Sequence, residues 1–78
     1  MPTILRDGPY RYFFFSNERG EPPHVHVERD RSVAKYWLED VSLASSTGFS
    51  ARDLRTIAWT VRTHRDEFLR RWHDFFVS

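Results

Sequence analysis

The sequence predicts an α+β fold in which an antiparallel sheet of four strands, or five, is covered on one face by one long C-terminal helix. Short runs of alternating side chains, separated by turn residues, fill residues 3–44, as is typical of strands joined by hairpins. Residues 51–76 contain neither glycine nor proline and place apolar side chains at helical spacing. The chain has 78 residues, so we expect one domain with the sheet in 3–44 and the helix in 50–76.

Turn residues set the limits of the expected strands. Asp7-Gly8-Pro9 closes the first hairpin. Pro22-Pro23 leads into a strand, because successive prolines favour an extended chain and argue against a helix. Val41 and Leu43 either add a short fifth strand at the edge or cover the end of the sheet. The expected strands cover residues 3–6, 10–15, 24–29 and 33–38.

A capping box marks the start of the helix. Ser50 is the expected N-cap, Asp53 follows three residues later, and Phe49 can pack on Leu54 as a hydrophobic staple. A continuous helix from here to residue 76 spans about 39 Å, whereas a six-residue strand spans about 20 Å. The helix is therefore expected to extend beyond the sheet.

The last turns of this helix carry five large apolar side chains that need cover. We expect them to contact a second copy of the chain, a partner protein or the N-terminal strand, since an exposed apolar patch of this size usually marks an interface. The alternative is a break near His64-Arg65 that folds the tail back over its own chain. The five residues are Phe68, Leu69, Trp72, Phe75 and Phe76.

The alternation of a strand divides residues 24–28 between two faces. Val25 and Val27 are expected to meet the helix, which leaves His24, His26 and Glu28 on the opposite, open face. The same parity turns Tyr12, Phe14, Ala34, Tyr36 and Leu38 towards the helix. It places Arg11, Phe13, Phe15, Lys35 and Trp37 beside the two histidines.

Three interpretations of His24 and His26 are open. As a general acid and base they could cleave RNA, with Lys35 or Arg11 stabilising phosphate charge. As a metal pair they would need a further ligand, for which Glu28 offers a carboxylate. They are otherwise hydrogen-bonding surface or interface histidines. The sequence alone assigns no metal site and no cofactor.

The remaining candidate binding residues lie on the open face and on the helix. Arg11, Phe13, Phe15, Glu28 and Trp37 form an aromatic and charged sheet surface that fits unpaired RNA bases or a protein partner. On the helix, Trp59 and Arg62 belong to a polar side that is either a solvated charged face or a surface for phosphate or an acidic partner. Arg65 falls within the apolar stripe, so we expect it to reach an acid such as Glu39 or Asp40, or to mark where the helix leaves the sheet.

Composition excludes several classes of protein. There is no cysteine, so neither a disulfide scaffold nor a thiolate zinc site can form. No apolar run matches a signal sequence or a membrane span, and we expect a cytoplasmic location and no membrane partner. The net charge is +1, which gives no strong expectation of nucleic-acid binding.

Several segments together resemble a small bacterial family, domain of unknown function 4160. They include Tyr12-Phe13-Phe14-Phe15-Ser16-Asn17-Glu18, Pro22-Pro23-His24-Val25-His26-Val27, Ala34-Lys35-Tyr36-Trp37-Leu38 and Gly48-Phe49-Ser50. Members of that family are often encoded beside a protein of domain of unknown function 2442, in an arrangement similar to a toxin and antitoxin pair. The resemblance implies a partner, and it supplies no set of catalytic residues.

These observations give three hypotheses for function. The first is a toxin-like member of a two-gene module that binds a cognate antitoxin-like protein, with RNA as a further ligand and His24, His26 and Lys35 as candidate ribonuclease residues. The second is an interaction or regulatory module without catalysis. The third is a metal-dependent hydrolase that uses the two histidines.

Overall fold

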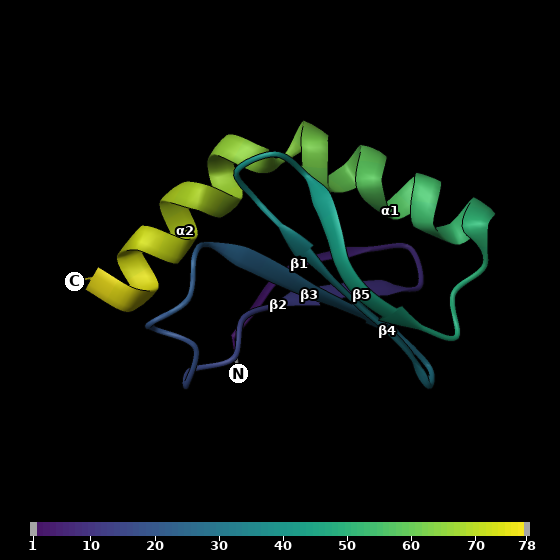
Figure 1. Ribbon diagram of the computed structural model, residues 1–78, viewed down its shortest axis with the longest axis horizontal. Helices are drawn as coiled ribbons and strands as arrows, with labels where there is room; N and C mark the ends of the chain where they lie inside the picture. The colour runs from purple at the N-terminus through teal and green to yellow at the C-terminus, as the bar shows by residue number, and fades with distance from the viewer. Residues whose placement is uncertain (1, 78) are drawn as a thin grey trace.

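The computed structural model describes residues 2–77 and the side chains of residues 2–76. Two helices form an arch over one face of a five-stranded antiparallel sheet (Figure 1), which confirms the predicted α+β fold. Within residues 2–77, no helix is both long and apolar enough to cross a membrane. The strands are β1 (Thr3–Asp7), β2 (Tyr10–Phe13), β3 (His24–Arg29), β4 (Ser32–Trp37) and β5 (Ser42–Thr47), and the helices are α1 (Ala51–Thr63) and α2 (Arg65–Val77).

The sheet is a meander, because the strands lie side by side in chain order from β1 to β5. β5 is the fifth strand that the sequence left open, and it extends the sheet to residue 47, past the predicted limit of 44. β2 ends at Phe13, two residues earlier than predicted. Gly48 then turns the chain towards α1 with a φ of +91°, and a Cβ there would lie 2.6 Å from the hydroxyl of Ser32. Both observations favour glycine at this position.

The core lies between the sheet and the two helices, as the strand parity predicted. Val25 and Val27 of β3 have no exposed surface, and neither have Ile57 and Val61 of α1. Tyr36 of β4 also donates a hydrogen bond from its hydroxyl to the carbonyl of Leu54, at 3.0 Å. Other predicted inward residues are buried as well, namely Tyr12, Phe14, Ala34 and Leu38.

The start of α1 has the predicted capping box. The Ser50 hydroxyl accepts a hydrogen bond from the Asp53 N–H at 3.0 Å, and the Asp53 carboxylate accepts one from the Ser50 N–H at 3.2 Å. Arg29 at the end of β3 forms two further bonds to that carboxylate, at 3.0 and 3.1 Å. This ion pair joins the first turn of α1 to the sheet.

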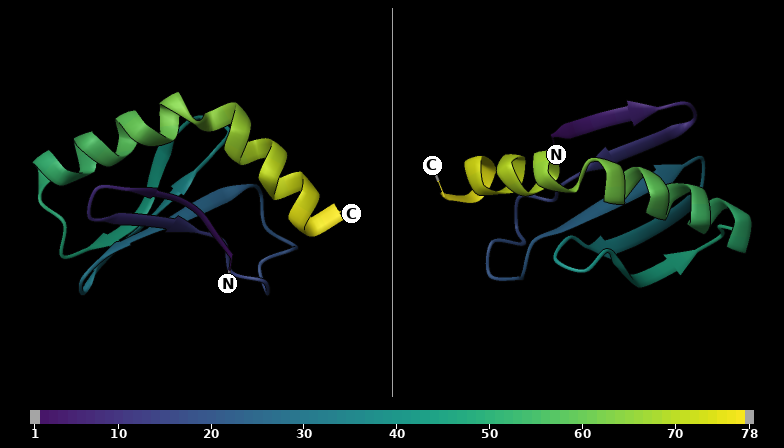
Figure 2. Two further views of the ribbon diagram at one scale, coloured as in Figure 1. Left: turned by 180° about the vertical axis from the view of Figure 1, so that it is seen from behind. Right: turned by 90° about the horizontal axis from the view of Figure 1, so that it is seen from above.

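The prediction of one continuous helix is wrong, because the helix breaks at His64. Figure 2 shows a bend between α1 and α2, which lets α2 descend past the end of the sheet. His64 ends α1 by donating from its N–H to the Thr60 carbonyl, and its own carbonyl accepts from the Phe68 N–H at 2.8 Å to begin α2. The observed break is the one near His64-Arg65 that the sequence offered as the alternative to a continuous helix.

The bend buries most of the helix tail within the same chain. Phe68 is fully buried, and Trp72 and Phe76 are 7% and 8% exposed. Trp72 packs edge-on against Phe14, with the ring centroids 5.2 Å apart. Leu69 is partly buried against the core, whereas Phe75 is 39% exposed. The bend therefore covers most of the tail within the same chain, and contact of the tail with a second copy or a partner protein stays a prediction.

Arg65 stabilises the bend through backbone carbonyls. Its guanidinium donates to the carbonyl of Leu38 at 2.8 Å and to that of Glu39 at 2.8 and 3.1 Å. The predicted bond to a carboxylate of Glu39 or Asp40 is wrong, and the only carboxylate bonded to this side chain within residues 2–76 is that of Asp66. Arg65 begins α2, which descends past the end of the sheet, so the other expectation, that this residue marks where the helix leaves the sheet, is confirmed.

Candidate functional site

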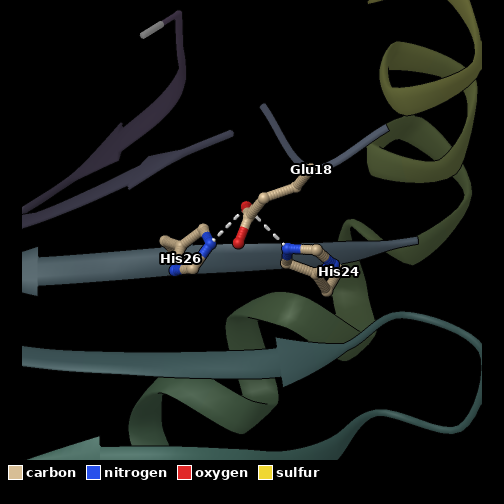
Figure 3. Close-up of side chains that lie close together, drawn as sticks. All are labelled: Glu18, His24 and His26. Carbon is tan, nitrogen blue, oxygen red and sulfur yellow. Dashed lines mark hydrogen bonds and ion pairs between the residues drawn. The ribbon is translucent and has the colours of Figure 1, made fainter. Parts of the chain in front are cut away.

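A carboxylate and two imidazoles meet beside the first half of β3. Glu18 comes from the loop of residues 14–23, and its Oε1 lies 2.8 Å from His24 Nε2 and 2.7 Å from His26 Nε2 (Figure 3). One ligand atom from each of the three residues lies within 4.8 Å of the other two. We call Glu18, His24 and His26 the Glu–His–His cluster.

His24 is completely buried, so the prediction that both imidazoles are open to solvent is wrong for this residue. It is the first residue of β3, where α2 descends past the end of the sheet. The Trp72 ring of α2 therefore covers it, at a centroid distance of 4.9 Å. The other ring nitrogen, Nδ1, lies 2.8 Å from the carbonyl oxygen of Pro22. Pro22, the first of the two prolines that extend the chain before β3, thus also fixes the orientation of this imidazole.

His26 is held between aromatic rings, and its side chain is 15% exposed. The Phe13 ring stacks on it at 5.5 Å with an interplanar angle of 24°, and Phe15 meets it edge-on at 4.5 Å. The predicted neighbourhood of Phe13, Phe15 and His26 is therefore confirmed. Burial lowers the pKa of His26, because desolvation disfavours the imidazolium, and the bond to Glu18 opposes this shift.

Glu18 is the member of the cluster that sequence reasoning missed. The strand alternation pointed to Glu28, which lies in β3, whereas Glu18 lies in a polar loop with no periodic pattern. Burial raises the pKa of Glu18, but hydrogen bonds and charge from His24 and His26 outweigh it and hold that pKa below its usual range. The only sequence signal was an acidic residue in the loop that leads to the histidine strand.

Acidic partners bind the other polar residues of the open sheet face. Arg11 forms a 2.7 Å ion pair with Glu28, so Glu28 lies outside the cluster. Lys35 pairs with β3 opposite His26, but its amine bonds to Glu21 at 2.7 Å and lies 4.5 Å from the centre of the Trp37 ring. The predicted residues therefore share one face, but their cations are already paired.

This arrangement is better suited to holding a small cation than to acid–base chemistry on RNA. A general acid and a general base must each contact the substrate. Here both imidazoles point at the same carboxylate oxygen, and His24 has no exposed surface. Phe13 is only 4% exposed, so its ring offers little area for stacking a base.

A second candidate site lies on the solvent face of α1, away from the cluster. Trp59 is 67% exposed, although tryptophan is a residue that proteins usually cover. Arg52 and Arg55 lie seven and four residues before Trp59, and Arg62 lies three residues after it. These spacings place the three arginines on the same side of the helix as Trp59. All three are exposed. We call these four residues the Trp59 face.

The Trp59 face has unpaired positive charge. Within residues 2–76, no carboxylate forms an ion pair with Arg52, Arg55 or Arg62. The one acid of α1 is Asp53, which is bound to Arg29 on the sheet side. Arg65, predicted as a binding residue with Trp59 and Arg62, is engaged at the bend instead.

A five-stranded meander under a bent pair of helices, with a Glu–His–His cluster at one end of the third strand, defines a small α+β protein. The chain belongs to the family described as a domain of unknown function (DUF4160), which matches residues 10–73 and confirms the resemblance seen in the sequence. No curated protein and no solved structure matches the chain significantly. The match includes the whole cluster and the Trp59 face.

Proposed function

We propose that this chain is the toxin-like member of a two-gene module and that it binds an acidic cognate protein through the Trp59 face. The observation that carries the binding proposal is Trp59 itself, which is 67% exposed, whereas Phe75 is 39% exposed and Trp72 only 7%. Tryptophan and arginine are enriched among the residues that dominate protein interfaces. The assignment to a two-gene module rests on the family resemblance.

Charge identifies the chemistry of the partner. Within residues 2–76, no carboxylate forms an ion pair with the three arginines of the Trp59 face, so an acidic surface is complementary to this face. Arg11 and Lys35 of the open sheet face are paired already and would have to give up those bonds. The helix face is therefore the better docking surface of the two.

Ribonuclease activity has weaker support than partner binding. It would require His24 to leave its position beneath Trp72 before it could contact a phosphodiester. RNA binding without cleavage would use the same Trp59 face, because exposed aromatic rings beside arginines also stack unpaired bases. The small net charge of +1 favours the protein partner.

Co-expression with the protein encoded by the adjacent gene tests the proposal. We expect the two proteins to co-purify, and we expect growth inhibition by this chain alone to be relieved by that protein. In calorimetric titration, Arg55→Glu is expected to weaken binding by about tenfold or more, since reversing a charge inside a complementary interface is unfavourable. Binding is also expected to weaken as salt concentration rises.

Arg70→Glu is the matched control, because Arg70 is an exposed arginine on α2. It should leave the affinity within about twofold. Failure of the two proteins to associate would overturn the proposal. So would equal effects of Arg55→Glu and Arg70→Glu. Saturable binding of a single-stranded RNA that is lost in Arg55→Glu, without protein binding, would assign the Trp59 face to RNA instead.

A further inference from the structure

Three atoms that can ligate a metal ion converge in the Glu–His–His cluster, and the surrounding protein fixes the direction of each. His24 Nε2 and His26 Nε2 both point at Glu18 Oε1, at 2.8 and 2.7 Å. Trp72 and Trp37 enclose the His24 ring, while Phe13 and Phe15 enclose that of His26. Imidazole rings held in this way lose little further freedom when they bind a ligand.

The hydrogen bond of His24 to Pro22 identifies which nitrogen is free to bind a ligand. A carbonyl oxygen only accepts, so Nδ1 carries a hydrogen and donates it to Pro22 at 2.8 Å. In a neutral imidazole, Nε2 then has a lone pair, and this lone pair faces an oxygen of Glu18. Two electron-rich atoms at this distance require either a proton between them, carried by the ring or by the carboxyl group, or a metal ion.

Metal-binding histidines show the same arrangement. They ligate through one nitrogen and donate the other N–H to a backbone carbonyl or a carboxylate, which fixes the tautomer. Adjacent ligand atoms of a tetrahedral zinc ion lie about 3.3 Å apart, given bonds of about 2.0–2.2 Å. The two nitrogen–oxygen distances here are 2.7 and 2.8 Å. Each distance would have to increase by about half an ångström to accommodate the ion.

We propose that Glu18, His24 and His26 bind one divalent transition-metal ion, with zinc preferred, through the two Nε2 atoms and a carboxylate oxygen. Two imidazoles and one carboxylate suit zinc and its neighbours better than calcium or magnesium, which prefer oxygen ligands. This inference is independent of the Trp59 face. It differs from the expectation from sequence, which assigned no metal site because the two histidines needed a further ligand and Glu28 was the carboxylate considered.

The ion would connect the loop of residues 14–23 to β3. Glu18 is the only ligand from this loop, and the loop has no regular secondary structure. The two histidines come from one strand, so without the carboxylate they give only two ligands. Three protein ligands leave one coordination position for water, and the side chains of Glu18 and His26, each 15% exposed, give access to it.

Metal titration of the full-length chain tests the inference. After treatment with a chelator, the protein is titrated with cobalt(II) and the visible absorption is recorded, and zinc is then added to displace cobalt. We expect one ion per chain, cobalt bands typical of four-coordinate nitrogen and oxygen ligation, and a higher melting temperature with zinc, since the ion binds only the folded state.

Two variants localise the ion without emptying the core. Glu18→Gln and His26→Ala are each expected to weaken zinc binding by at least about tenfold, because each removes a ligand. His24 is fully buried, so its replacement would confuse loss of a ligand with loss of folding. His73→Ala is the matched control, because His73 is exposed on α2 outside the cluster, and it should bind zinc like the parent chain.

Two results would overturn the inference. The first is the absence of saturable binding of cobalt or zinc to a parent chain that is folded by circular dichroism. The second is binding that is unchanged in Glu18→Gln and His26→Ala, which would show adventitious coordination elsewhere on the surface. In either case the cluster would be a set of side chains joined by hydrogen bonds alone.

Discussion

The two tryptophans of the C-terminal half show how differently this small protein uses its two helices. Trp72 of α2 is 7% exposed and covers His24 and Phe14, whereas Trp59 of α1 is 67% exposed. The charges differ in the same way. Near Trp72 the polar groups of the Glu–His–His cluster are bonded to one another, and beside Trp59 three arginines have no acidic partner within residues 2–76.

This contrast separates residues that maintain the fold from residues that remain free for binding. A side chain that already contacts the core or bonds to a neighbour must break those contacts before it can bind anything else. A side chain exposed to water gains contacts when a partner covers it. The Trp59 face is thus suited to a macromolecular partner, and the enclosed cluster to a small ion.

Replacement of the two tryptophans is the largest test of this comparison. Trp72→Ala is expected to lower the free energy of unfolding by about 3–5 kcal/mol, because it leaves a cavity between α2 and His24. Trp59→Ala should change it by no more than about 0.5 kcal/mol. Urea denaturation followed by circular dichroism measures both, and similar losses for the two variants would show that the contrast is wrong.

The arginines provide the next test, since the Arg65 side chain is bonded to two carbonyls, whereas within residues 2–76 no carboxylate forms an ion pair with Arg62. Arg65→Ala leaves the carbonyls of Leu38 and Glu39 without their donor and should lower the free energy of unfolding by about 1–3 kcal/mol. Arg65→Lys should restore only part of the lost free energy of unfolding, because an ammonium lacks the planar fork of a guanidinium. Arg62→Ala serves as the control, and a loss equal to that of Arg65→Ala would contradict the role of the bend.

The smallest effect is expected at Asp53, the one acid of α1. Its hydrogen bond to Arg29, followed by that to the Ser50 N–H, holds the pKa of Asp53 well below its usual range. The ionised carboxylate therefore stabilises the fold above about pH 4, and this contribution is lost as pH falls below that value towards the folded-state pKa. Asp53→Asn removes it.

Thermal unfolding at several pH values measures this effect. The melting temperature of Asp53→Asn should lie below that of the parent near neutral pH, and the difference should narrow in acid. Asp66→Asn is the control, because the Asp66 side chain is 93% exposed and its ion pair is worth little. A gap between the parent chain and Asp53→Asn that widens as pH falls would contradict the assignment.

Local patterns in the sequence predicted the fold well, and they failed where distant segments meet. Alternation identified β3 and the inward Val25 and Val27, and the capping box identified the start of α1. The bend at His64 was only an alternative, because no glycine or proline marks it. Once the helix bends, Trp72 covers His24, which strand parity alone had placed in solvent.

The candidate site was predicted in part for the same reason. The two histidines of the cluster lie in a regular strand, so their spacing was informative. Glu18 reaches them from an irregular loop, and no periodicity connects a loop residue to strand residues six and eight positions later. The exposure of Trp59 could be predicted because this residue lies on the polar side of the helix. The ion pairs of Arg11 with Glu28 and of Lys35 with Glu21 could not, because they join segments that are distant in the sequence.

The division between the two regions is tested most directly by the affinity of the adjacent gene product. This affinity is measured side by side for the parent chain, for Trp59→Ala and for Glu18→Gln. We predict that Trp59→Ala weakens binding by about 30-fold, equivalent to about 2 kcal/mol for an interface anchor, while Glu18→Gln leaves it within about twofold. Loss of binding in Glu18→Gln with full affinity in Trp59→Ala would contradict the account.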